Sequence, residues 1–270
     1  MAFDANNLII DHIIRGIMFS TTTNTPLWAI NEISDASLNV TVETQDAVNA
    51  LGTPIRTFNR GKTAEFSANN SIFDLGLAAA QGGTEKIVAS ADNKILSPCF
   101  LEVDLTEKNL TTLELPSNRV PKGQITTMKI LNGDGTFGKT FKNGSAASAT
   151  DFVHADGATT VTLPTGLKAG QTLFIYYDFE AENAVQIVNT ATDFPKAGKF
   201  VMEVLGADAC DPTKQIHAFV TFPNALLMGE FEWSFTTEGN HPFTIKANMN
   251  YCDRKKELFK VTVIDDDADE

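Results

Sequence analysis

The chain is poor in cysteine, in histidine and in positive charge. Its 270 residues include 3 Cys and 4 His, and 21 Lys and Arg stand against 34 Asp and Glu, so the formal net charge is −13. Because phosphate affinity depends on clustered cations, this balance argues against a tight nucleic-acid binder. With 43% hydrophobic and 20% charged residues, the chain has enough apolar material to fold around a core.

Export signals, disulfide patterns and long apolar runs are also missing. Cys99, Cys210 and Cys252 lie far apart with no C-x-x-C pair, which favours a reducing compartment over a disulfide framework. The N-terminus carries Asp4 and Asp11 where a secretion signal needs positive charge. No run approaches the roughly 18 consecutive apolar residues of a transmembrane helix. We therefore expect a soluble protein that is not exported.

Two common catalytic and metal-binding motifs, G-x-S-x-G and H-E-x-x-H, are absent from the sequence. The histidines occur singly, without a second ligand at zinc spacing, and those in strand-like runs are expected to be hydrogen-bonded structural imidazoles. They are His12, His154, His217 and His241, of which His12 and His217 lie in such runs. We predict no enzymatic activity, no cofactor and no metal.

Three groups of acidic residues need separate interpretation. The segment 132–138 places Asn132, Asp134 and Thr136 two apart, similar to a calcium loop, but it lacks the closing Glu and favours a glycine-rich hairpin turn. The acidic residues 265–270 predict a solvated tail. Acids suited to glycoside hydrolysis are too common in this chain to be informative. Examples are Asp178, Glu180 and Glu182.

Alternation of apolar and polar residues predicts strands near the N-terminus. Leu38, Val40 and Val42 alternate with polar residues, which is typical of a strand with one wet face. Similar patterns occur at residues 15–20, 26–30 and 63–68. Residues 70–81 instead have helical spacing, start with a capping Asn-Ser pair and stop at a Gly-Gly pair, which predicts one short helix.

Beyond residue 95, many short strand-like runs are separated by Asn-Gly, Asp-Gly, Pro and Gly, as in sandwiches and barrels. Phe231, Trp233 and Phe235 alternate with polar residues and predict a strand whose aromatic face lines a core or a subunit contact. Residues 106–173 are rich in Thr, Gly, Asn and Ser, which suggests an inserted lobe. We expect a mainly β fold, a β-sandwich or barrel with one short helix, divided into a domain at 1–105 and 174–264, a β-rich insertion at 106–173 and an acidic tail at 265–270.

The order of these segments resembles the tail tube (major tail) proteins of tailed bacteriophages, whose β-rich subunits form hexameric rings that stack into a tube. Residues 15–83 resemble the family's first hairpin, long loop, returning strand and short helix. Residues 170–249 resemble its later core strands, and the run FPNALLMGEFEWSFTTEGNHPFTIKA at 222–247 is similar to a recurring closing pattern of tube subunits. The insertion has no counterpart in this comparison and is expected to be an outward β lobe, for instance an immunoglobulin-like one.

The resemblance implies a virion structural protein that is made in the host cytoplasm. Its partners are expected to be other copies of itself and other tail proteins, while DNA passes through without specific binding and no membrane is involved. The acidic charge suits such a conduit, although acidity for solubility explains it equally well. The loop at 43–62 is expected to reach the adjacent ring, with Arg56, Arg60 and Lys62 pairing with acids there; an ordinary solvated loop is the alternative.

Two other functions stay open at this stage. A head decoration or head-to-tail connector protein has the same style of β-rich subunit, and its assembly state distinguishes it from a tube subunit. A glycan-binding β-sandwich module is the second alternative, although its aromatic platforms are usually Trp or Tyr and this chain has 2 Trp and 3 Tyr against 19 Phe.

Overall fold

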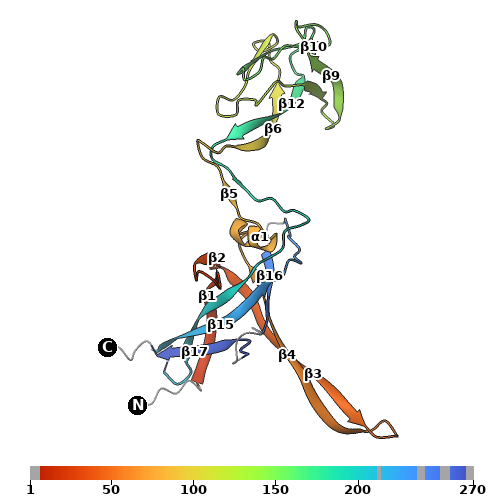
Figure 1. Cartoon of the computed structure of the whole chain (residues 1–270). Helices are drawn as coiled ribbons and strands as arrows, with labels where there is room; N and C mark the ends of the chain where they lie inside the picture. The colour runs from red at the N-terminus through yellow and green to blue at the C-terminus, as the bar shows by residue number, and fades with distance from the viewer. Residues whose placement is uncertain (1–6, 212–213, 236–240, 250–255, 266–270) are drawn as a thin grey trace. The chain divides into compact units, whose positions relative to one another are not determined.

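The computed structural model describes residues 7–211, 214–235, 241–249 and 256–265 (Figure 1). Cys252 and the acidic residues 266–270 lie outside this part of the chain. The fold is mainly β, as expected, and it divides into two compact units. Unit 1 consists of Met1–Lys86 and Ile187–Glu270, and unit 2 consists of Ile87–Gln186.

Unit 1 is built on one antiparallel sheet in which the strand order is β2-β1-β14-β15-β16-β4-β3. The N-terminal half of β15 pairs with β17 and its C-terminal end pairs with β16, so β15 connects two parts of the sheet. The strands are β1 (Leu8–Phe19), β2 (Pro26–Ile30), β3 (Ile33–Val48), β4 (Pro54–Asn70), β14 (Ala197–Asp208), β15 (Gln215–Leu227), β16 (His241–Ala247) and β17 (Lys260–Asp265). The strands predicted before residue 70 are confirmed within β1 to β4. The expectation of a single wet face in β3 is wrong for the single chain, because Leu38, Val40 and Val42 are exposed as well as their polar neighbours.

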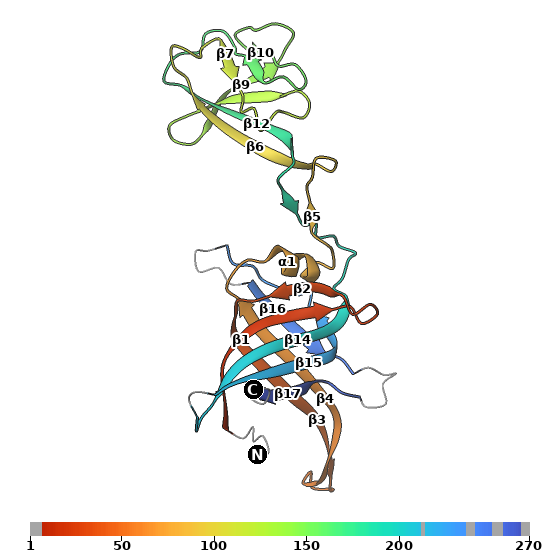
Figure 2. The same ribbon diagram turned by 90° about the vertical axis from the view of Figure 1, so that its left-hand side faces the viewer.

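The core of unit 1 is a cluster of phenylalanines from strands distant in the sequence. Phe66 of β4 lies with its ring centroid 6.1 Å from Phe200 of β14 and 6.3 Å from Phe222 of β15. These contacts require β4 to lie across β14 and β15, and Figure 2 shows the strands crossing in this way. The predicted shared face of Ala64, Phe66 and Ala68 is buried in this core.

Helix α1 (Leu75–Gln81) is shorter than the helix predicted over 70–81. Asn70 was expected to help cap the helix, but it belongs to the ladder of β4, where it pairs with His241. The cap is Asp74, whose carboxylate accepts a 2.7 Å hydrogen bond from the backbone N–H of Leu77. The helix ends at Gly82, as the Gly-Gly signal predicts. In the described part of the chain, no helix is long and apolar enough to cross a membrane.

Unit 2 contains a five-stranded sheet in the order β10-β9-β8-β12-β6 and two short strand pairs, β11-β7 and β13-β5. The strands are β5 (Ile87–Val88), β6 (Ile95–Asp104), β7 (Thr112–Glu114), β8 (Thr127–Leu131), β9 (Phe137–Asn143), β10 (Asp151–Phe152), β11 (Thr160–Thr162), β12 (Thr172–Ala181) and β13 (Val185–Gln186). Met128, Phe141 and Ile175 lie in its separate core. The unit extends beyond the predicted lobe 106–173 at both ends because β6 pairs with β12 along its whole length.

Candidate functional site

The segment expected to be a long loop at 43–62 is instead a long β-hairpin. Its strands stay paired from the core outwards to the Val48 and Pro54 pair, and the turn is held by Asn49, whose backbone N–H donates to the carbonyl of Thr53 over 2.9 Å. The loop expectation is wrong because turn residues such as Gly52 occupy only the tip. We call residues 41–63 the arm. Every residue in the arm is exposed, and the arm projects from unit 1 away from α1 (Figures 1 and 2).

The three predicted contact cations all lie on the β4 strand of the arm. The guanidinium carbons of Arg56 and Arg60 lie 5.2 and 5.7 Å from the ring centre of Phe58. Arg60 also donates a 2.9 Å hydrogen bond from Nε to the side-chain oxygen of Gln45 on β3. Lys62 lies opposite Val42 in the strand register. The two arginines and Phe58 therefore form an ordered cationic surface with an aromatic centre.

The tip of the arm exposes large apolar side chains. Leu51 in the turn is 89% exposed and Ile55 at the start of β4 is 72% exposed. Val48 at the end of β3 is also exposed. Several large apolar side chains exposed on one hairpin tip are the kind of surface that proteins normally bury against a partner.

A groove lies at the opposite end of unit 1, between β2 and α1. Its volume is about 460 Å³. Its apolar lining comes from β2, α1 and the end of β15, and charged residues complete the lining. The apolar residues include Leu27, Trp28, Ala79, Ala80 and Leu227, and the charged residues are Asp74, Glu85, Lys86 and Lys196. We call this feature the α1 groove.

The sheet of unit 1 has strands with unpaired edges. Among the described residues, β2 pairs only with β1, β3 only with β4 and β17 only with β15, and α1 contacts β2. Exposed edges of this kind are templates for strand addition by another chain, and natural proteins usually protect them with lysine or proline. The 16 residues of β3 contain neither.

The segment with Phe231, Trp233 and Phe235 is not the strand that its alternation predicts. The ladder of β15 with β16 ends at Leu227, and residues 231–235 continue outside any strand. Trp233 stacks on Phe231 with ring centres 4.6 Å apart and meets Phe73 edge-on at 5.2 Å, whereas Phe235 is 84% exposed. The three aromatic residues therefore do gather, but against the residues that precede α1.

A buried polar network underlies this aromatic cluster. Nδ1 of His241 accepts a 3.2 Å hydrogen bond from the backbone N–H of Asp74, so Nε2 carries the proton and donates to the side-chain oxygen of Gln81 over 2.8 Å. The same oxygen accepts from the indole N–H of Trp233 over 3.3 Å. Burial lowers the pKa of His241, opposed by the nearby Asp74 carboxylate. The network holds the neutral imidazole that this geometry requires.

Comparison with known protein families decides what kind of protein carries these surfaces. The profile of the YomU/Tube protein family matches residues 8–257, which is nearly the whole chain. The chain belongs to this family. Among curated proteins, no sequence matches the chain.

Membership of the YomU/Tube family makes the chain a structural protein of a phage tail tube. The family assembles from copies of its own subunit together with other tail proteins, and its members are parts of the virion. This agrees with the resemblance drawn from the order of the segments. The open sheet edges and the exposed arm are therefore surfaces of a protein that associates with itself.

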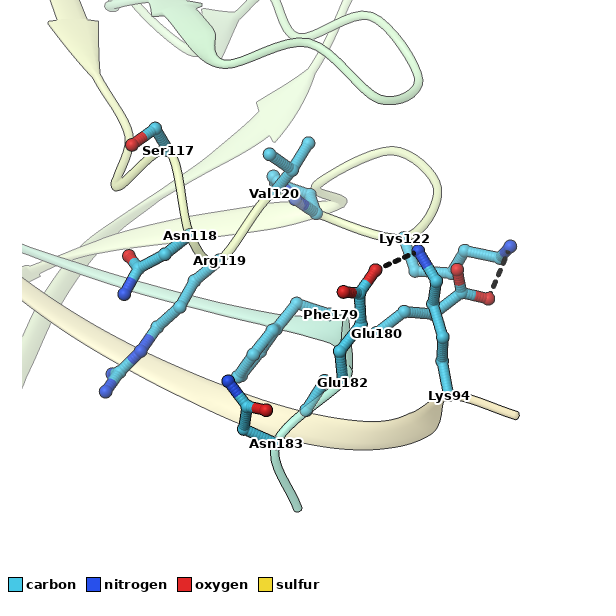
Figure 3. Close-up of a pocket in the computed structure, with 12 residues that line it drawn as sticks. Lys94, Ser117, Asn118, Arg119, Val120, Lys122, Phe179, Glu180, Glu182 and Asn183 are labelled. Carbon is cyan, nitrogen blue, oxygen red and sulfur yellow. Dashed lines mark ion pairs between the residues drawn. The ribbon is translucent and has the colours of Figure 1, made fainter. Parts of the chain in front are cut away.

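A polar cleft of about 640 Å³ lies beside the end of β12 in unit 2 (Figure 3). Two ion pairs line it, Lys94 with Glu182 at 2.8 Å and Lys122 with Glu180 at 2.7 Å. Hydrogen bonding from Lys122 lowers the pKa of Glu180. A general acid for glycoside hydrolysis needs a raised pKa, so Glu180 is unsuited to that role.

The remaining residues singled out by the sequence have local partners. Asp134 accepts from the hydroxyl and the backbone N–H of Thr136 within the hairpin turn between β8 and β9, so the turn interpretation of residues 132–138 is confirmed. The buried His154 bonds Ile125 and Ala158 at 3.2 and 3.0 Å, His217 lies 3.6 Å from Glu203, and His12 lies 3.0 Å from Asp11. The described residues bring together no group of three or more His, Cys, Asp or Glu.

Proposed function

We propose that the chain closes into hexameric rings that stack into the tail tube and enclose an acidic conduit for the genome. The observation that carries this proposal is the combination of unpaired sheet edges with an exposed arm in one unit of a tail-tube family member. Strand addition at the edge of β3 links neighbours within a ring, because a repeated heterologous contact closes into a ring.

The arm is proposed to reach the adjacent ring. Arg56, Arg60 and Lys62 place positive charge there in a chain whose net charge is −13, so they attract acidic groups of the next ring and fix the register. The cluster of Phe231, Trp233 and Phe235 is proposed as a subunit-packing surface, since Phe235 is exposed in the single chain.

The proposed conduit works by repelling DNA rather than by binding it. Acidic groups on the inner wall act on phosphates over roughly 8 to 10 Å at physiological salt. DNA then slides without specific contacts, and the proposed role includes no enzymatic activity, cofactor or membrane contact. We place synthesis of the protein in the host cytoplasm before assembly.

Negative-stain electron microscopy of the purified full chain, concentrated near neutral pH and seeded with sheared tail fragments, tests this function. Long hollow tubes or six-fold rings are the expected result. Monomers or trimers that remain monodisperse with seeds, and that decorate capsid shells, would contradict the tube role and favour a head decoration protein.

A further inference from the structure

We infer that the α1 groove receives the tip of the arm from a second copy of this chain in the adjacent ring. This inference rests on the proposed stacking of rings and names the surface that the arm contacts. The occupant is therefore a segment of this chain, residues 48–55, and the receptor lies between β2 and α1.

The positions of the two surfaces make the contact intermolecular. The arm and α1 lie at opposite ends of unit 1 in both views (Figures 1 and 2). The arm is a continuously paired hairpin, and at about 3.3 Å per residue the strand from Thr63 to Pro54 extends roughly 30 Å beyond the core. A copy's tip therefore points away from its own groove. A contact between opposite ends of identical subunits is heterologous and repeats without limit along one axis, as a tube requires.

The apolar groups on the two surfaces are complementary in kind and in number. The tip presents Leu51 and Ile55, which are 89% and 72% exposed. The groove of about 460 Å³ is open to solvent and walled by Trp28 and Leu227, with the half-exposed Leu27 at its mouth. Apolar anchors that enter a preformed pocket supply most of the energy of such contacts. Each copy carries one tip and one groove, so every contact inside the stack is satisfied.

The charges around the two surfaces can fix the register of the contact. The groove lining includes Glu85 and Asp74, whose carboxylate also caps α1. Arg56 follows Ile55 in β4 and lies on the opposite face of the strand, so it borders the contact when Ile55 enters the groove. The lining also includes lysines, which suit Asp46 on the opposite strand of the arm. Opposite charges at the edge of an apolar contact contribute more to orientation than to affinity.

Cysteine cross-linking in assembled protein tests the contact directly. The parent variant replaces Cys210 and Cys252 with Ser and keeps the buried Cys99. In this background, Leu51→Cys combined with Leu27→Cys should give a ladder of disulfide-linked oligomers after mild oxidation of tubes. The matched control combines Leu51→Cys with Phe100→Cys, an exposed position of unit 2, and should give no ladder.

The outcomes separate this inference from the proposed function. Tubes that form normally but give no ladder with Leu51→Cys and Leu27→Cys would overturn the groove assignment and leave the tube role standing. A ladder as strong in the Phe100 control as in the test pair would also overturn it. If neither the parent variant nor the wild-type chain forms rings or tubes, the proposed function is contradicted, and so is the inference that rests on it.

A complementation experiment provides a second, independent test. Leu51→Asp removes the apolar tip and Leu27→Asp places a charge at the groove mouth, and both positions are exposed, so folding is expected to persist. Each variant alone should stop at single rings. When rings of one variant are mixed with rings of the other, they should form pairs of rings. The Leu51→Asp ring keeps its groove and the Leu27→Asp ring keeps its tip, so one contact between them is intact. Normal tubes from either variant alone would refute the assignment.

Discussion

Nε2 of His241 donates a 2.8 Å hydrogen bond to the side-chain oxygen of Gln81 in the interior of unit 1. The bond joins the first residue of β16 to the last residue of α1, which lie far apart in the sequence. Because Nδ1 already accepts from the N–H of Asp74, a second proton on the ring has no acceptor there. The network therefore depends on the imidazole being neutral.

This network predicts that acid destabilises unit 1. The pKa of His241 is lowered by burial from its usual value of 6.5 in the unfolded chain. As the pH is lowered below 6.5, the unfolded chain binds a proton at His241 before the folded chain does. The free energy of unfolding therefore decreases as the pH is lowered, until the folded state is protonated as well. Above pH 6.5 both states are neutral and the full contribution is present. Denaturant unfolding between pH 5 and 8 measures this slope.

The matched variants isolate the contribution of this one histidine. His241→Asn should flatten the pH dependence of the unfolding free energy relative to wild type. His12→Asn removes an exposed histidine beside Asp11 and is the matched control for the loss of one imidazole. An equal flattening in both variants would show that the buried network is not its source.

The cations of the arm predict a specific assembly defect. Replacing Arg56, Arg60 and Lys62 with Ser should slow or abolish tube polymerisation, because the arm loses its positive charge and the cation–π contacts around Phe58. Turbidity and electron microscopy follow the rate and the product.

A control with the same change in net charge separates a local effect from a global one. Three exposed lysines of unit 2 serve for this purpose: Lys108, Lys142 and Lys168. Their replacement with Ser should leave polymerisation close to wild type. If the variant with Ser at positions 56, 60 and 62 assembles normally, the proposed electrostatic role of the arm is contradicted.

The sequence predicted the strands of unit 1 where their patterning is regular, and missed what depends on distant partners. Leu38, Val40 and Val42 alternate cleanly and lie in β3. Beyond them the pattern is lost at a register shift between Glu43 and Thr44, so the outer half of the hairpin resembled a loop. Alternation is present at Leu38, Val40 and Val42 although these side chains are exposed in the single chain, whereas the residues beyond them carry no alternation and lie in an arm with no buried face.

The candidate site was predictable in part. The position of Arg56, Arg60 and Lys62 on one projecting segment was implied by the resemblance to tail tube proteins. Trp233 shows the limit: its alternation with polar neighbours predicts a strand, but its indole N–H bonds Gln81, and this partner cannot be identified locally. The α1 groove is likewise formed by β2, α1 and the end of β15, segments brought together only by the fold.

A close backbone approach makes Gly83 sensitive to substitution. It follows α1 with φ of +72°, and an added Cβ would lie 2.4 to 2.5 Å from the backbone of Phe194. Gly83→Ala should therefore lower the free energy of unfolding by more than about 1 kcal/mol, through strain and displacement of the residue 194 segment. Gly52 in the arm turn has φ of +79° and open space around it. Gly52→Ala should cost less in a urea titration, and equal costs would argue against the steric contribution.

The two separate cores predict that unit 2 can be removed without unfolding unit 1. Ile87 pairs with Gln186 in the β5 and β13 ladder, so the chain leaves and returns to unit 1 at neighbouring points, about 5 Å apart between paired Cα atoms. A short Gly-Ser linker in place of Ile87–Gln186 can span this distance. Each unit also has its own cluster of buried side chains.

The shortened chain should unfold in a single thermal transition and still form tubes. Phe222→Ala removes a buried ring from the core of unit 1 and should lower the free energy of unfolding in that transition by about 3 to 5 kcal/mol. The corresponding Phe141→Ala in the intact chain should instead affect only the transition of unit 2, because Phe141 lies in the other core. Two results would show that the units are one cooperative structure: a shortened chain that fails to fold, or a Phe141→Ala variant in which both transitions shift equally. If the two cores are independent, removing one ring from unit 2 does not change the stability of unit 1.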